Sequence, residues 1–235
     1  MDGSLTIQVW SDPLCPWCWV AERRLEKAME EFLNRDRVNI ELRSFRLMPG
    51  VPVHTVGELF ARKGLSEAET HARFDQMEQI AAKEGLTYHL ASTDLAGDTM
   101  NILRLIKFAG NKGLESKFVE RLYRAYLSEH TSLFERETLL RLSDEVGLDR
   151  SGAEAVLDSR AFQDEVERDE EDARNVGVRG VPYYLFEEGI ALAGDQPVEQ
   201  YASALRQAWN HVQGNTAVLV GATCGPDGCE LPNYP

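Results

Sequence analysis

The sequence is poor in cysteine and in basic residues, and it contains no long apolar run. Four cysteines in 235 residues are too few for a fold held together by disulfides. Lysine and arginine number 25 against 39 aspartates and glutamates, and the net charge of −14 argues against binding to nucleic acid or anionic lipid. No apolar stretch approaches the ~20 residues that span a bilayer, and no signal peptide is visible. We therefore expect a soluble, cytoplasmic protein.

Ordinary globular composition accompanies these absences. Hydrophobic residues make up 43% and charged residues 27% of the chain, which is typical of soluble domains. A chain of this length buries a sizeable core without disulfides or a structural metal ion. The histidines show no spacing typical of metal ligands, and we expect no metal or other cofactor.

The N-terminal segment predicts a strand, a helix and a second strand. Apolar and polar residues alternate over 6–10 and again over 38–45, as in β-strands. Between them, apolar residues recur at helical spacing from Cys15 to about Asn34. Strand, helix and strand in this order favour a parallel βαβ unit.

The following stretch, 56–176, is helical in pattern throughout. Ser66 opens a capping box with Glu69, a typical helix start. The acidic run 164–172 is interpreted as the solvated face of a helix, because apolar residues supply that helix with a buried side.

Strand signals return near the C-terminus. The segments 182–186 and 190–193 flank a turn, and Pro197 stands at the start of a last helix. The chain thus reads as one α/β domain split by a helical one. The predicted parts are 1–55 (first part, βαβ), 56–176 (helical insertion), 177–213 (second part, ββα) and 214–235 (a tail with two cysteines).

Cys15 and Cys18 carry the chemistry that the sequence indicates most strongly. Two cysteines three apart at a helix start lie on one face and within bonding distance. Unpaired amides and the helix dipole stabilise a thiolate at Cys15, and Pro16 suits the first turn because it has no amide hydrogen to lose. The thiolate is the nucleophile of disulfide exchange. We expect Cys18, one turn further on and more buried, to resolve the mixed disulfide.

Two other interpretations of these cysteines remain open. A structural disulfide is disfavoured in a reducing compartment. A four-cysteine metal site would need Cys15 and Cys18 to converge with Cys224 and Cys229. Structural zinc sites usually place the first pair in a turn, and Pro16-Trp17 leading into a long helix matches that poorly.

The segment 11–19, SDPLCPWCW, resembles the active-site opening of the DsbA-like thioredoxin-fold family, and most closely its FrnE-like branch. The resemblance implies a thioredoxin fold with a large helical insertion and a C-terminal cysteine-containing tail. It also implies a thiol–disulfide oxidoreductase or isomerase acting on protein disulfides or thiols, with glutathione or a thioredoxin system as a further partner. Gly180-Val181-Pro182 is similar to the family's cis-proline loop. That similarity implies a cis Pro182 and a Val181 backbone that pairs with substrate peptide.

Related enzymes of this architecture, the hydroxychromene-carboxylate isomerases and kappa-class glutathione transferases, use a serine as the key hydroxyl. Asn101 resembles an asparagine position of those enzymes, although a helix-start role is the safer interpretation. Because the chain has Cys15 instead of serine, glutathione-dependent isomerisation or transfer is the second hypothesis. Asp12 is interpreted as a turn residue before Pro13, with proton transfer as the alternative. Trp17 either contacts apolar substrate chains or packs over the cysteines.

The tail pair, Cys224 and Cys229, flanks four turn-forming residues, so its sulfurs can meet without strain. The resemblance to the FrnE-like branch implies a second cysteine pair at this place. Three roles stay open: a redox relay with the first pair, a structural clip, or half of a metal site.

Overall fold

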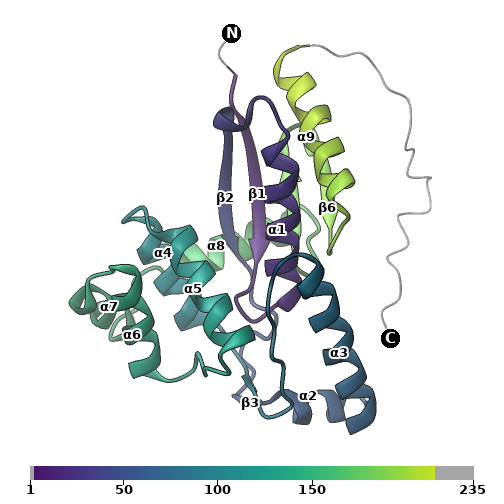
Figure 1. Ribbon diagram of the computed structural model, residues 1–235. Coiled ribbons are helices and arrows are strands. Elements are labelled where there is room, and N and C mark those ends of the chain that lie inside the picture. The colour runs from purple at the N-terminus through teal and green to yellow at the C-terminus, as the bar shows by residue number, and fades with distance from the viewer. Residues whose placement is uncertain (1–2, 215–235) are drawn as a thin grey trace.

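A four-stranded mixed sheet forms the centre of the computed structural model, which describes residues 3–214 (Figure 1). The strand order is β2-β1-β5-β6. Its strands are β1 (Leu5–Ser11), β2 (Val38–Ser44), β5 (Tyr183–Phe186) and β6 (Ala191–Ala193). β1 pairs in parallel with β2, as predicted for the βαβ unit, and antiparallel with β5. A short 3₁₀ turn, η2 (Glu187–Gly189), separates β5 from β6 where the turn was predicted.

Two helices cover one face of this sheet. α1 (Pro16–Glu30) and α9 (Val198–Val212) pack side by side there (Figure 1). α1 ends before the predicted Asn34, and a 3₁₀ turn, η1 (Arg35–Arg37), follows. The apolar periodicity had suggested a longer helix because Phe32 is apolar, but Phe32 lies beyond the helix and packs edge-on against Trp209, with ring centroids 5.8 Å apart.

Helix α8 (Gln163–Asn175) packs against β2 and carries the acidic run. Asp164, Glu167 and Glu171 of that run are exposed, as the interpretation as a solvated face expects, but Asp169 is buried and departs from it. Its carboxylate accepts the Ser44 amide at 2.8 Å and pairs with Lys107 at 2.6 Å. Its backbone carbonyl accepts the indole of Trp10 at 2.9 Å. Burial of the Asp169 carboxylate is possible because the Ser44 amide and Lys107 replace water around it.

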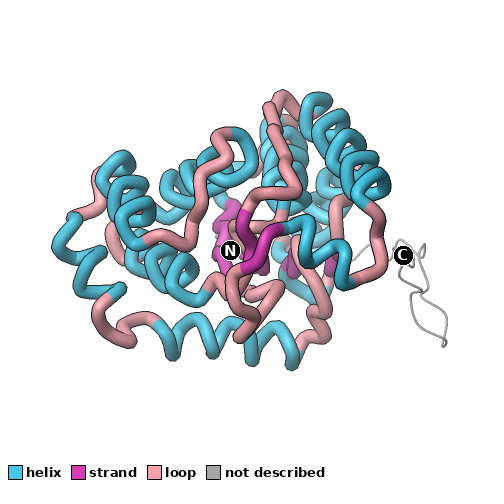
Figure 2. Tube along the Cα trace, turned by 90° about the horizontal axis from the view of Figure 1, so that it is seen from below, coloured by secondary structure: helices cyan, strands magenta, loops and turns pink. Residues whose placement is uncertain are grey.

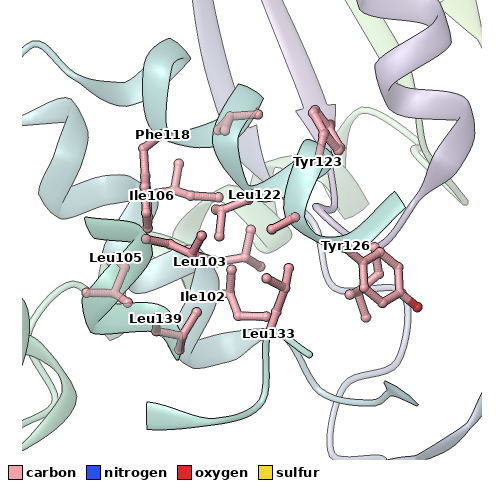
Figure 3. Close-up of a cluster of buried hydrophobic side chains, with 14 of the residues drawn as sticks. Ile102, Leu103, Leu105, Ile106, Phe118, Leu122, Tyr123, Tyr126, Leu133 and Leu139 are labelled. Atoms are coloured by element: carbon pink, nitrogen blue, oxygen red, sulfur yellow. The ribbon is translucent and has the colours of Figure 1, made fainter. Parts of the chain in front are cut away.

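The stretch between β2 and α8 is predominantly helical, as predicted. It contains α2 (Val56–Arg62), α3 (Glu67–Lys83), α4 (Met100–Gly110), α5 (Glu115–Ser128), α6 (Arg136–Val146) and α7 (Arg150–Leu157). Ser66 caps α3 with the capping box predicted from the sequence. The short antiparallel pair β3 (His54–Thr55) and β4 (Leu95–Ala96) was not predicted, because two-residue strands leave no measurable alternation. Leucine, isoleucine and aromatic side chains of α4, α5 and α6 form the core of this region (Figure 3).

α1 lies between two apolar cores. On one side Cys15, Cys18 and Trp19 pack with the core of the helical region. On the other side Ala21 and Leu25 pack with the sheet and α9. Figure 2, which looks onto the end of the molecule, shows the strands surrounded by helices. The start of α1 therefore stands at the junction of the sheet and the helical region. Within residues 3–214, no helix is both long and apolar enough to cross a bilayer.

Candidate active site at the start of helix α1

Cys15 is the N-cap residue of α1 and Pro16 is the first residue of the helix. The Cys15 amide donates to the Asp12 carbonyl at 2.9 Å, and the Cys18 amide donates to the Cys15 carbonyl at 3.1 Å. These bonds form the tight turn that carries the chain from β1 into the helix. Since no side chain caps the helix start, its free amide groups remain directed at the position of Cys15.

Both thiols of this pair are free and buried, with 4% of Cys15 and 2% of Cys18 exposed. The expected contrast in burial between the two is therefore slight. Burial raises the pKa of the Cys18 thiol well above its ordinary value, and the hydrogen bond and charge of Cys15 add to that rise. The backbone amide of Asp12 offsets a part of this rise. Cys18 is thus a neutral thiol at rest and must lose a proton before it can attack a disulfide.

The loop before β5 completes the surroundings of Cys15. The Val181–Pro182 peptide bond is cis, as the resemblance implied. The Cys15 thiol donates to the Val181 carbonyl at 3.5 Å, across 166 residues of sequence. Pro182 is buried and Val181 is partly buried against the apolar core of the helical region. Trp17 is also partly buried against this core.

Asp12 is a buried junction between three segments and does more than form a turn. Its Oδ1 accepts the Leu14 amide at 2.9 Å, and its Oδ2 accepts the Leu47 amide at 2.9 Å and the Thr99 hydroxyl at 3.0 Å. Burial raises the pKa of the Asp12 carboxyl from 3.8 to about 6, although the three hydrogen bonds act in the opposite direction. The carboxyl therefore ties the cysteine turn to the segments that follow β2 and precede α4.

Two further groups near the thiols were not singled out from the sequence. Glu22 lies one helical turn beyond Cys18, and burial raises the pKa of its carboxyl to about 8. Tyr88 donates its hydroxyl to the Pro16 carbonyl at 2.7 Å. The four-residue spacing from Cys18 could have identified Glu22. No local pattern could have identified Tyr88, which lies in a loop between α3 and β4.

The remaining predicted residues lie elsewhere or outside the described range. Asn101 is exposed in the first turn of α4, and its side chain accepts from Arg104 at 3.0 Å, which agrees with the helix-start interpretation. Cys224 and Cys229 lie outside the described residues. Within 3–214, no three His, Cys, Asp or Glu side chains converge as a metal site would require.

Comparison with known proteins relates this site to a family. The family described as the DSBA-like thioredoxin domain matches residues 6–206. The chain belongs to this family. Its DsbA-like fold includes the cysteine turn of α1 and the cis-proline loop within the matched range.

Solved DsbA-like structures agree with this assignment. A probable DsbA oxidoreductase from Streptomyces coelicolor, SCO1869, is 35% identical, with a TM-score of 0.85 over 97% of this chain and 99% of that one. The cytosolic disulfide reductase DsbM of Pseudomonas aeruginosa is 22% identical, with a TM-score of 0.61 over 86% of this chain and 98% of that one, and shows the fold alone. The uncharacterized protein YwbO of Bacillus subtilis (strain 168) is 25% identical over 169 residues, which cover 67% of this chain and 74% of YwbO.

Proposed function

We propose that the protein is a thiol–disulfide oxidoreductase, with isomerase activity, that acts on protein disulfides. The observation that carries this proposal is the pair of free thiols at the start of α1, with Cys15 against the carbonyl that precedes the cis proline. Family membership supports the same chemistry. The partners would be proteins with disulfides or thiols, in the cytoplasm, with glutathione or a thioredoxin system as the source of electrons.

The proposed reaction has two exchange steps. The Cys15 thiolate attacks one sulfur of a substrate disulfide, and the other substrate sulfur leaves as a thiolate. The Cys18 thiolate then attacks the Cys15 sulfur and releases the second substrate thiolate, so that two electrons pass to the substrate and a Cys15–Cys18 disulfide forms. Because the pKa of Cys18 is raised, this second step requires removal of its proton within the site. Val181, through its backbone, and Trp17 would hold the substrate peptide beside Cys15.

The test is reduction of insulin by the reduced protein. Cys15→Ser abolishes the reaction, since no nucleophile remains. Cys18→Ser instead accumulates mixed disulfides with insulin, detected as higher-mass species on a non-reducing gel. The control is Asp36→Asn, which keeps all four cysteines and changes a side chain that is 95% exposed. Full activity in Cys15→Ser overturns the assignment.

The tail pair has a proposed role of its own. Cys224 and Cys229 would exchange electrons with Cys15, as expected for the FrnE-like branch in which we place the protein. α9 is about 22 Å long at ~1.5 Å per residue, and its C-terminal end lies away from the start of α1 (Figure 1). Ten further residues reach at most ~33 Å, which exceeds the length of α9.

A cross-link tests this relay. In oxidised Cys18→Ser protein, digestion and mass spectrometry should yield a Cys15–Cys224 or Cys15–Cys229 peptide. Its absence, together with unchanged turnover in the Cys224→Ser, Cys229→Ser double variant, would leave the tail pair with a structural role.

A glutathione-dependent isomerase or transferase is the second candidate, favoured only by the shared architecture. The matching solved structures include a 2-hydroxychromene-2-carboxylate isomerase, 17% identical with a TM-score of 0.63. Conjugation or isomerisation that survives in Cys15→Ser, where serine supplies a hydroxyl, would favour this candidate. A four-thiolate metal protein would instead be purified with stoichiometric zinc.

A further inference from the structure

The loop residue Tyr88 touches the peptide that separates the two cysteines. Its hydroxyl donates to the Pro16 carbonyl at 2.7 Å, although the two residues are 72 apart in sequence. Only 4% of Tyr88 is exposed. Burial raises the pKa of its hydroxyl, and the nearby charges of Cys15 and Cys18 raise it further. The phenol therefore lies close to both thiols and remains a hydrogen-bond donor throughout the physiological pH range.

Tyr88 is itself held from two sides by backbone-directed bonds. The amide of His89 donates to the Leu127 carbonyl at 2.8 Å, and the Ser128 hydroxyl donates to the Thr87 carbonyl at 2.5 Å. Leu127 and Ser128 both belong to the last turn of α5. The loop is thus fixed to the helical region at the residues immediately before and after Tyr88.

The ring of Tyr88 is also fixed. It stacks on Trp19 of α1 with ring centroids 5.6 Å apart, and Tyr123 of α5 stacks on Trp19 at 5.7 Å. The Trp19 indole donates to Glu120 at 2.9 Å, and Glu120 pairs with Arg23. Stacked aromatic rings of this kind add stability beyond their buried area. The helical region therefore contacts the first turn of α1 through a rigid aromatic group.

We propose that Tyr88 is a positioning residue for disulfide exchange: its hydroxyl fixes the Pro16 carbonyl and so sets how the thiols of Cys15 and Cys18 project from the first turn of α1. This inference rests on the proposed oxidoreductase function. In a helix the Pro16 carbonyl also accepts an amide four residues further on, so it keeps one partner when Tyr88 is changed. The hydroxyl therefore contributes mainly to the orientation of the turn and little to the stability of the fold.

Orientation of the two thiols affects the equilibrium of their disulfide. Oxidation by glutathione disulfide joins the Cys15 and Cys18 sulfurs and releases two molecules of glutathione. A turn that already holds the sulfurs in bonding geometry loses less freedom when the bond forms. Loss of the Tyr88 hydroxyl should thus disfavour the protein disulfide by up to about tenfold, the equivalent of one ordinary hydrogen bond. A tenfold change moves the potential of the couple by about 30 mV toward easier reduction.

The experiment compares Tyr88→Phe with Tyr123→Phe. Both variants keep the ring that stacks on Trp19 and lose one buried hydroxyl near Cys18, but only the first loses the bond to Pro16. Each full-length protein is equilibrated in glutathione buffers of graded ratio, alkylated and digested. The fraction of Cys15–Cys18 disulfide is then read by mass spectrometry. Circular dichroism and urea unfolding of the same samples show that the populations compared are folded.

We expect the Tyr88→Phe disulfide to be three- to tenfold less favoured than that of the wild type, with Tyr123→Phe unchanged. Insulin reduction by Tyr88→Phe should lose kcat by a similar factor at constant KM, because Tyr88 does not form the peptide-binding loop. An unchanged equilibrium in Tyr88→Phe, or an equal shift in Tyr123→Phe, overturns the proposal. If the equilibrium shifts as expected but the wild type does not reduce insulin, the proposed function fails and the positioning role of Tyr88 stands.

Discussion

Replacement of Asp12 by asparagine separates two contributions of this buried carboxyl to the free energy of unfolding. One is its hydrogen bonds and the other is its ionisation, and their balance depends on pH. Both carboxylate oxygens accept backbone amides, from Leu14 and from Leu47. An asparagine of the same shape must direct its NH₂ group at one of these amides. A buried donor left without an acceptor costs about 1–3 kcal/mol. A carboxyl presents an oxygen to both amides whether or not it is protonated, so Asp12→Asn loses up to this amount across the pH range.

The charge of Asp12 acts in the opposite direction. Its pKa is raised from 3.8 to about 6, so the folded protein binds more protons than the unfolded chain between these two values. The stabilising contribution of the neutral carboxyl is complete below pH 3.8 and is lost as the pH rises through about 6. At about 1.4 kcal/mol for each unit of pKa, the loss is about 3 kcal/mol. Asparagine does not ionise and avoids it.

The expected result is a difference in stability that changes with pH. Urea unfolding at 25 °C should find Asp12→Asn about 1–3 kcal/mol less stable than the wild type near pH 4. Near pH 7.5 this deficit should have shrunk by about 3 kcal/mol, to equality or a slight gain. The control is Asp36→Asn, because the Asp36 side chain is 95% exposed. A difference for Asp12→Asn that stays constant over this range, as we expect for Asp36→Asn, would refute the reasoning.

Three further changes probe other parts of the fold by the same urea assay. Glu22→Gln should gain about 2–4 kcal/mol of stability relative to the wild type as the pH rises from 4.5 to above about 8, because the buried carboxyl, with its pKa of about 8, must then ionise beside Glu26. A pH-independent difference would contradict this. Arg104→Met should lose about 2–4 kcal/mol, since the buried guanidinium donates to the carbonyls of Ser159 and Ala161 at 2.6 and 2.7 Å, and a loss below 1 kcal/mol would count against that role. Ser66→Ala should lose about 1 kcal/mol with its cap on α3, and an unchanged midpoint would mean that the capping box contributes nothing.

Local patterns predicted most of the elements, and long-range contacts explain the exceptions. β1 and α1 were predictable because their periodicity reflects the faces that they bury. The junction at Asp12 was not predictable, because its partners Leu47 and Thr99 lie 35 and 87 residues away in the sequence. Locally, an aspartate before a proline is typical of a turn. Asp169 is a similar case, since its acidic neighbours suggest a solvated face while its partner Ser44 lies 125 residues earlier.

The candidate site divides in the same way. The spacing of Cys15 and Cys18 and the proline of the cis-proline loop were visible in the sequence. Both are short motifs whose chemistry or backbone geometry follows from the residues themselves. Tyr88 belongs to the site only through the folding of the helical region around α1. A tyrosine in a loop carries no signal of its contact with Pro16, so only the structure could place it there.

The pairing of β1 with β5 sets the order in which the protein can be completed. Ile7 of β1 pairs with Phe186 of β5. The edge of β1 that pairs with β5 therefore stays unpaired until almost the whole chain has been synthesised. At ~5–20 residues per second on the ribosome, this interval lasts roughly 10–35 s. During that time the Val181 carbonyl has not yet been synthesised or has not reached the Cys15 thiol. The nascent chain therefore exposes Cys15 and Cys18 to the surrounding redox pool before the cis-proline loop can cover them.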